Sequence, residues 1–509
     1  MAEPQASSPA PDAQVAEGEA SLLDSILSKV EVKMPDASVR VSDFKHQSAV
    51  AEKDRGAMVS AALRVFIDAV TSMETSVEKI DKFLLDSLIA SIDEKISTQL
   101  DVILHHDDFQ DLESAWRSLK DLVDRTDFRK NITLELLSVT KEELRESFED
   151  APELIQSALY KHVYTNAYDQ PGADPYAAIV TDYEFDSSAM DVALLQNASK
   201  VAASAHCPFL ANVGPKFFGK DSMEEWKKIP DLTAYMETAD YIKWNSFRDS
   251  EDARYVGLSF PRYMARLPYG PDTNPVKSFN YVEDVKGSDH DKYLWGSSSF
   301  LFASNMVKSF MSDGWCVQIR GPQAGGKVDD LPVHMYDVGK GKQMKIPTEV
   351  PISETLEFEC ANLGFIPVSH YQGQDFAVFF SANSAQRPQL YDDPDATANS
   401  RINARLPYIF LASRISHYLK VLQRENIGAT KDKTVIEDEL NAWLNGLVTE
   451  MPNPTPAQVA KYPLRAAQVE VHDVEDNPGF FRVQTSIMPH FQIEGMDINL
   501  SLVGKLPKK

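Results

Sequence analysis

The sequence predicts a mixed α/β protein of several domains, and three observations support this fold class. Its 509 residues are enough for roughly three domains of ordinary size, or two large ones. Between about residues 130 and 380, strand-like segments alternate with helix-like ones, which favours a sheet covered by helices. Near the C-terminus, apolar and polar side chains alternate with a period of two, which is typical of strands.

Residues 1–56 are expected to form a flexible arm, because the first part is rich in Pro, Ala and acids and poor in large apolar side chains. Within the arm, a short amphipathic helix is expected at 21–30, and its apolar side chains share one stripe: Leu22, Leu23, Ile26, Leu27 and Val30. So short a helix is not stable alone. It either docks on the rest of this chain or binds in a groove of another protein, and both remain open.

Two helical regions follow the arm and open a large N-terminal domain, which is expected to span 57–388. The first is expected from about 57 to 105, with apolar residues at helical spacing from Leu85 to Ile103. The second is expected at about 109–125. It should turn one apolar face towards the core: Leu112, Ala115, Trp116, Leu119, Leu122 and Val123.

The rest of this domain is expected to alternate strands and helices. Helices are expected at 140–163, 187–204 and 294–312. Strands are expected at 132–139, 176–183, 207–211, 254–260, 315–320, 358–361, 364–369 and 376–380. A break at 384–398, rich in Asp, Asn and Pro, is the candidate domain boundary.

The C-terminal domain, 389–509, is expected to begin with a helix at 402–424. Thr434 and Glu437 have the spacing of a capping box that opens the next helix. A strand is expected at 467–472, and two further strands at 480–488 and 496–502 form a terminal hairpin. One face of the hairpin carries Phe481, Val483, Thr485 and Ile487 on its first strand and Met496, Ile498, Leu500 and Leu502 on its second.

This terminal hairpin has consequences for assembly. A lone hairpin is marginally stable in water, and its open edges are usually covered or paired. The strands that complete it come either from its own domain or from a neighbouring chain, which is a known recognition mode.

Bulk composition excludes several function classes. The formal net charge is −25, from 76 acidic and 51 basic residues, which argues against a general nucleic-acid binder and against an anionic membrane surface. No apolar run of about 18 residues and no signal peptide is present, so neither membrane insertion nor secretion is expected. The three cysteines, Cys207, Cys316 and Cys360, form no CxxC pair, so reduced thiols in the cytoplasm are expected.

Two motifs are typical of ligand sites but lack the residues that would complete them. Residues 321–327 fit the GxxxxGK pattern of a phosphate loop, but Val328 replaces the Ser or Thr that holds magnesium, and two acids and a Pro follow. His105 and His106 precede two aspartates, but adjacent residues point in different directions. No catalytic residue, cofactor or metal is therefore expected.

Many short motifs occur in an order that resembles one family across about residues 75–505. They include ESAWRSLK at 113–120, AHCPFL at 205–210, RDSEDARYVG at 248–257, LSFPRY at 258–263, WGSSSF at 295–300 and RGPQAGG at 320–326. They continue with NLGFIP at 362–367, FFSANS at 379–384, NARLPY at 403–408, QRENIG at 423–428 and PHFQIEG at 489–495. In these motifs the chain resembles the large subunit of the type VI secretion contractile sheath, the TssC/VipB family.

The resemblance implies a structural protein of the bacterial cytoplasm. Its sheath-like core is completed by a small partner subunit, TssB/VipA-like. Such heterodimers stack as six-fold rings into a helical tubule around an inner tube, on a baseplate, and contraction drives the tube outward. The resemblance also implies that strands at about 479–489 and 493–503 join strands of neighbouring small subunits in a shared sheet, a form of strand exchange.

A further implication concerns the helix at 21–30. In this family a ClpV-type AAA+ unfoldase grips an N-terminal helix to recycle contracted sheaths, and the corresponding anchors here are Leu22, Leu23, Ile26 and Leu27. Two alternatives remain. One is a phage-tail-like sheath subunit that needs no separate small subunit, and the other is a nucleotide-binding enzyme that uses the loop 321–327.

Overall fold

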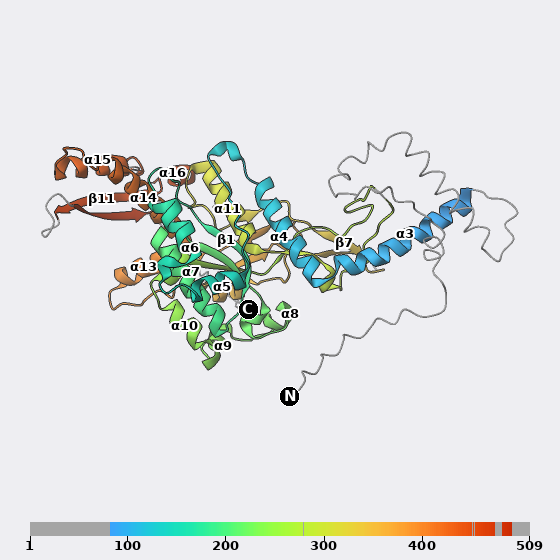
Figure 1. Ribbon diagram of the computed structural model, residues 1–509. Coiled ribbons are helices and arrows are strands. Elements are labelled where there is room, and N and C mark those ends of the chain that lie inside the picture. Colours follow the sequence, from blue (N-terminus) through green and yellow to red (C-terminus); the bar gives the residue numbers. More distant parts are fainter. Residues whose placement is uncertain are drawn as a thin grey trace, which may run out of the picture. The chain divides into compact units, whose positions relative to one another are not determined.

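The computed structural model describes residues 82–277, 279–339, 341–449, 451, 453–473 and 481–490 (Figure 1). The chain divides into two compact units, residues 1–100 with 276–281 and residues 101–275 with 282–509. The predicted arm and its helix at 21–30 lie outside the described residues, as does the second hairpin strand. Helix α3 (Lys82–Leu104) is the described part of the long helical region expected at 57–105.

The centre of the second unit is a six-stranded sheet in the order β1-β2-β3-β9-β10-β6. Strands β1, β2, β3 and β9 run parallel to one another, and β10 is antiparallel to both of its neighbours, β9 and β6. The strands are β1 (Ile179–Phe185), β2 (Phe209–Val213), β3 (Val256–Phe260), β6 (Lys327–Val328), β9 (Ile366–His370) and β10 (Ala377–Phe379). Both β2 and β3 are buried along their whole length, which explains their nearly continuous apolar sequences. The predicted mixed α/β fold is confirmed.

Helices cover both faces of this sheet. Alternate residues of each strand point to opposite faces and pack against different helices. Phe209, Ala211 and Val213 of β2 pack in one core with helix α7 (Ala189–Ala205). Leu210, between them, packs in another core with α11 (Ser298–Asp313) and α14 (Leu406–Glu425). The sheet is thus the middle layer between two separate apolar cores.

A buried polar cluster fixes the start of α11 on the sheet. Asn212 is 4 % exposed, and its Oδ1 accepts the backbone N–H of Ser299 at 2.8 Å. Its amide nitrogen donates to the carbonyl of Thr181 at 3.2 Å, and the hydroxyl of Ser259 donates to Oδ1 at 3.2 Å. The first turn of a helix has N–H groups without internal partners, and the asparagine satisfies one of them inside the protein.

A third core lies in the C-terminal part of the chain. It is formed by α14, by α15 (Lys433–Asn445), and by a two-stranded sheet of β11 (Leu464–Asp473) and β12 (Phe481–Pro489). Figure 1 shows α15 lying along β11. The strand predicted at 467–472 and the first hairpin strand predicted at 480–488 are both confirmed.

The remaining elements connect these layers. The helices are α4 (Asp107–Asp124), α5 (Lys141–Glu149), α6 (Ala158–Tyr160), α8 (Met223–Trp226), α9 (Leu232–Met236), α10 (Ile242–Arg248), α12 (Glu354–Asn362), α13 (Pro394–Asn403) and α16 (Pro456–Lys461), with a π-helix at Lys161–Asp169. The short strands are β4 (Tyr263–Met264), β5 (Trp295–Gly296), β7 (His334–Asp337) and β8 (Lys342–Lys345).

Three of the predicted strands are wrong. Residues 358–361 lie in α12, which begins where the Ser353 hydroxyl accepts the N–H of Leu356. Residues 315–320 bury Val317 and Ile319 but pair only through one bridge, between Arg320 and Gly325. Residues 132–139 are in no helix and in no strand. Each sequence has apolar or β-branched residues, but a strand also requires a neighbour to pair with.

The predicted capping box at Thr434 is also wrong. Helix α15 begins earlier, at Lys433, with Asp432 as an N-cap that makes no side-chain hydrogen bond. In the described part of the chain, capping boxes open α5, with Thr140 and Glu143, and α16, with Thr455 and Gln458.

The predicted inward face of α4 is wrong for Leu112, Trp116 and Val123. Leu112 is 56 % exposed, Trp116 58 % and Val123 38 %, whereas Ser118 and Leu122 are buried. The cause is that polar side chains on the other side of α4 are hydrogen-bonded into the domain, which turns the apolar stripe outwards.

Candidate assembly surface

The C-terminal ribbon is the two-stranded sheet of β11 and β12, and the sequence predicts contacts with other chains there. Strands β11 and β12 pair antiparallel, from Leu464 opposite Pro489 to Asp473 opposite Phe481. The first predicted hairpin strand therefore pairs with the strand that precedes it in the chain. The residues predicted for the second strand, Met496, Ile498, Leu500 and Leu502, lie outside the described residues.

The predicted alternation along β12 is reproduced. Val483, Thr485 and Ile487 are half-buried, and Val483 and Ile487 pack against the third core. Phe481, at the start of the strand, is exposed. Three of the four predicted residues thus face the chain's own domain, and they serve first to hold the ribbon in place.

The two edges of the ribbon are unequal. On the β11 edge, Asn441 of α15 makes two hydrogen bonds to the backbone of Val469: its Oδ1 accepts the N–H at 2.8 Å and its Nδ2 donates to the carbonyl at 2.9 Å. Glu437, one turn earlier, accepts the N–H of Val471 at 3.2 Å. Helix side chains thus occupy the backbone groups with which a further strand would pair.

The β12 edge has no such cover among the described residues. There β12 pairs with β11 alone. Its outward side chains are Arg482, Gln484, Ser486 and Met488, all exposed. An open strand edge is a template for pairing with another strand. The geometry therefore directs any added strand to β12 and away from β11.

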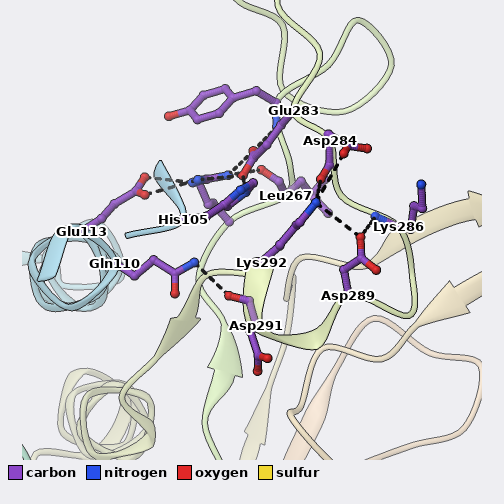
Figure 2. Close-up of polar contacts among 12 residues, drawn as sticks. His105, Gln110, Glu113, Leu267, Glu283, Asp284, Lys286, Asp289, Asp291 and Lys292 are labelled. Carbon is purple, nitrogen blue, oxygen red and sulfur yellow. Dashed lines mark hydrogen bonds and ion pairs between the residues drawn. The ribbon is translucent and has the colours of Figure 1, made fainter. Parts of the chain in front are cut away.

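A buried ion cluster fixes the N-terminal half of α4 (Figure 2). Arg266, 6 % exposed, lies between two carboxylates: its Nε is 2.9 Å from Glu113 Oε1, and its Nη1 is 2.7 Å from Glu283 Oε2. Glu283 also contacts His105 Nε2 at 3.1 Å and accepts the N–H of Tyr269 at 2.8 Å. Burial lowers the pKa of Arg266, but hydrogen bonds to both carboxylates outweigh this and raise it above its usual value.

The glycine loop at 321–327 has the geometry of a structural turn. The N–H groups of Gly321 and Gly326 donate to the carbonyls of Phe379 and Gly321 at 2.7 and 2.9 Å. Lys327 pairs with Asp329 at 2.5 Å and lies 4.1 Å from the ring centroid of Phe376. Strand β6 follows the loop where a phosphate site would need a helix N-terminus. The N–H groups of Gly321 and Gly326 and the side chain of Lys327 are thus engaged within the protein itself.

The metal-ligating side chains of the described residues do not converge. No group of three or more His, Cys, Asp or Glu side chains among them has the arrangement of a metal site. His105 contacts Glu283, whereas the side chain of His106 is 63 % exposed, so the two rings do not converge. Cys207 and Cys360 are buried and unpaired, and Cys316 is half-buried. None of the described helices combines the length and apolarity needed to cross a bilayer.

Sequence reasoning missed the residues that decide which edge of the ribbon is open. Asn441 and Glu437 look like ordinary polar positions of an amphipathic helix. No spacing rule indicates that they meet a strand edge, because that contact depends on how α15 packs along β11.

Two solved structures match this chain at low identity and low TM-score. The baseplate of the anti-feeding prophage matches with a TM-score of 0.37 and 12 % identity, covering 73 % of this chain and 83 % of that one. The contracted sheath complex of PVC, an extracellular contractile injection system, matches with a TM-score of 0.35 and 10 % identity, covering 65 % and 72 %.

Sequence comparisons are far stronger. Family models described as the EvpB tail sheath N-terminal domain and the EvpB tail sheath gpW/gp25-like domain match residues 86–386 and 395–506. The type VI secretion system sheath protein TssC1 of Pseudomonas aeruginosa is 40 % identical over 475 residues, which cover 92 % of this chain and 95 % of that protein. The chain therefore belongs to the VipB/EvpB family of tail sheath proteins.

Proposed function

We propose that this chain is the large structural subunit of a type VI secretion contractile sheath. It pairs with a small sheath subunit, and the heterodimers polymerise into a six-fold helical tubule around an inner tube. Contraction of the tubule drives the tube outward. The observation that carries this proposal is the 40 % identity to a type VI sheath protein over 92 % of the chain.

The open edge of β12 supports a shared-sheet joint between subunits. Strands at about 479–489 and 493–503 would belong to a sheet completed by neighbouring small subunits. Because Val483 and Ile487 already pack on their own domain, the neighbour would join at a strand edge of this sheet and not on the inner face of β12. The exposed Phe481 and the residues Met496, Ile498, Leu500 and Leu502 would complete the joint.

The other parts of the proposal follow from the same role. Further copies of the chain, the inner tube protein and the baseplate are partners in the bacterial cytoplasm. A ClpV-type unfoldase recycles the contracted sheath by gripping Leu22, Leu23, Ile26 and Leu27. The chain needs no catalytic residue, because the energy for contraction is stored in the extended lattice at assembly. The division at 388/389 separates the two sheath domains.

Coexpression with the small sheath subunit tests the proposal, and negative-stain electron microscopy of the purified pair should show tubules. Removing residues 479–509 should abolish them, because the joint between subunits is lost. A control is a variant that substitutes the exposed Ile427, in the turn after α14 and outside the ribbon, with Glu, and it should assemble normally.

Three outcomes separate the possibilities. A wild-type chain that remains a monomer beside the small subunit contradicts the proposal. Tubules formed by the chain expressed alone favour a phage-tail-like sheath subunit instead. A truncated chain that still assembles and contracts refutes the shared-sheet joint but leaves the sheath role in place.

A further inference from the structure

Helix α4 has the reverse polarity of an ordinary surface helix. Apart from the buried Leu122, its inner face is polar and is anchored by specific contacts. Glu113 holds Arg266 and also pairs with Arg117 at 2.6 Å. The hydroxyl of Ser114 donates to the carbonyl of Trp295 at 2.7 Å, and the fully buried Ser118 accepts the N–H of Ser297 at 3.2 Å. These contacts fix the rotation of α4 about its axis.

The outer face of α4 is apolar. Leu112, Trp116 and Val123 lie within about 40° of one another around the helix, at 100° per residue. They are 56 %, 58 % and 38 % exposed. A helix on a free surface normally has the opposite arrangement, with apolar side chains inside. Because α4 is held in this orientation by its buried polar face, the stripe is suited to contact with another molecule.

The segment that follows α4, residues 131–139, also lacks backbone hydrogen-bond partners among the described residues. No backbone N–H from Asn131 to Val139 donates a hydrogen bond to another described residue. The segment has a strand-like sequence, and Leu136 and Leu137 are 67 % and 52 % exposed. It is tethered near β1, because the Tyr183 hydroxyl donates to the carbonyl of Val139 at 2.6 Å.

These two surfaces are adjacent along the chain. Six residues connect them, and Phe128 among these is 50 % exposed. Helix α11 packs against both α4 and the edge strand β1, and the segment ends at Val139, which packs with Tyr183 of β1 in the α7 core on the other face of the sheet. We infer that the α4 stripe and residues 131–139 together form a docking face for a different protein chain, which lays an apolar helix on the stripe and adds a β-strand to the segment.

Assembly geometry decides that the occupant is a different chain. Two copies that met through the same face would form a closed two-fold pair, whereas a sheath subunit is a link in an open helical polymer. Charge supports the same choice, since Asp107, Asp108 and Asp111 are exposed at the start of α4 and a second copy brings the same acids. The occupant therefore carries basic side chains beside its apolar face. This inference rests on the proposed function, in which the occupant is the small sheath subunit.

The test is copurification of each variant with a tagged small sheath subunit. Trp116→Glu should lower the recovered partner roughly tenfold or more, because it places a charge at the centre of an apolar contact. Ile427→Glu, at a residue 82 % exposed elsewhere, is the matched control and should leave recovery unchanged. The melting temperature of each variant chain alone should equal that of the wild type.

A proline pair tests the strand. Neighbouring N–H groups of a strand point to opposite edges, so a ladder on one edge uses the N–H of either residue 136 or residue 137. Leu136→Pro and Leu137→Pro should therefore differ in partner recovery by roughly tenfold. Equal recovery for the two variants would overturn the strand contact.

Other results would overturn the docking face itself. If the wild-type pair and the Trp116→Glu pair are recovered and form tubules equally well, the face is wrong while the proposed function stands. If the wild-type pair does not associate, both fail. A lower melting temperature for Trp116→Glu alone would show that the chain covers its own stripe. A homodimer that Trp116→Glu dissociates would make a second copy the occupant.

Discussion

His417 shows how a single buried side chain joins distant parts of the chain. It lies on α14, is 3 % exposed, and its Nε2 is 2.9 Å from the carbonyl of Ala205 at the end of α7. The bond requires the ring proton on Nε2. Burial lowers the pKa of His417 to about 4, helped by the positive charges of Arg414 and Lys420. The ring therefore stays neutral at pH 7.

This pKa predicts an acid-side loss of stability. Between pH 6.5 and about 4, the unfolded chain binds a proton at His417 that the folded chain does not, so the free energy of unfolding falls as the pH falls. The loss from this residue is at most about 2 kcal/mol at pH 5. His417→Gln keeps an N–H donor but cannot titrate, so it should show a smaller loss.

Urea unfolding of the full-length wild type and variant at pH 7 and pH 5 measures this difference. His206, whose pKa is also lowered by burial, acts in the same direction, so the variant should lose only part of the pH dependence. An unchanged dependence in His417→Gln would contradict the assignment.

Gly326 predicts a second effect at the residue scale. A Cβ on this residue would lie 2.4 Å from the nitrogen of Gly321 and 2.4 Å from the carbonyl oxygen of Phe379, both backbone atoms. Gly326→Ala should therefore lower the melting temperature markedly. Gly339→Ala, at a residue with φ of +77° and no atom within 4 Å of its added Cβ, is the control and should cost only about 1–2 kcal/mol. Equal melting temperatures for the Gly326→Ala and Gly339→Ala variants would show that the loop shifts to accommodate the added methyl group.

At the scale of elements, the parallel strands and long helices were the most predictable features. Buried parallel strands such as β2 have continuous apolar sequences, and α14 has a long amphipathic one, so both were found within a few residues. The errors at 132–139 and 315–320 share a cause: a strand-like sequence specifies a conformation but supplies no neighbour. On α4, an apolar stripe indicates burial without saying against which molecule.

The protected edge of the ribbon gives a prediction for one element. Asn441→Ala removes both hydrogen bonds to Val469, whose backbone groups then lack partners, and this should cost roughly 2–3 kcal/mol. The variant should also self-associate, because the β11 edge is opened. Thermal unfolding and light scattering measure the two effects. Asn399→Ala, at an exposed position of α13, is the control; if both variants match the wild type, Asn441 has no protective role.

At the scale of the whole molecule, the family was predictable and the interfaces were not. Motifs from residue 113 to residue 495 specified the family because many occur in one order. Interfaces depend on which faces remain uncovered after folding, and this follows from packing of polar anchors such as Ser118 and Asn441. The alternation along β12 was predictable from the sequence, but the half-buried position of Val483, Thr485 and Ile487 against their own domain was visible only in three dimensions.

The proposed recycling step predicts a separation of functions. Leu23→Asp places a charge in the apolar stripe of the helix expected at 21–30 and should weaken binding of a ClpV-type unfoldase at least several-fold. Tubule assembly should be unchanged, because the assembly surfaces lie elsewhere in the chain. Pull-down with the unfoldase and electron microscopy of the same preparation measure the two effects. Unaltered unfoldase binding by the Leu23→Asp variant would show that the unfoldase does not bind this helix.

The unequal edges of the ribbon give each subunit a direction. A ribbon that accepts a strand on both sides can grow without limit, as fibrils do. Here the amide of Asn441 occupies one side, so among the described residues only the β12 side is left for a further strand. In the proposed sheath, this asymmetry would prevent runaway sheet formation and would give linkage between neighbours a polarity before any ring is complete.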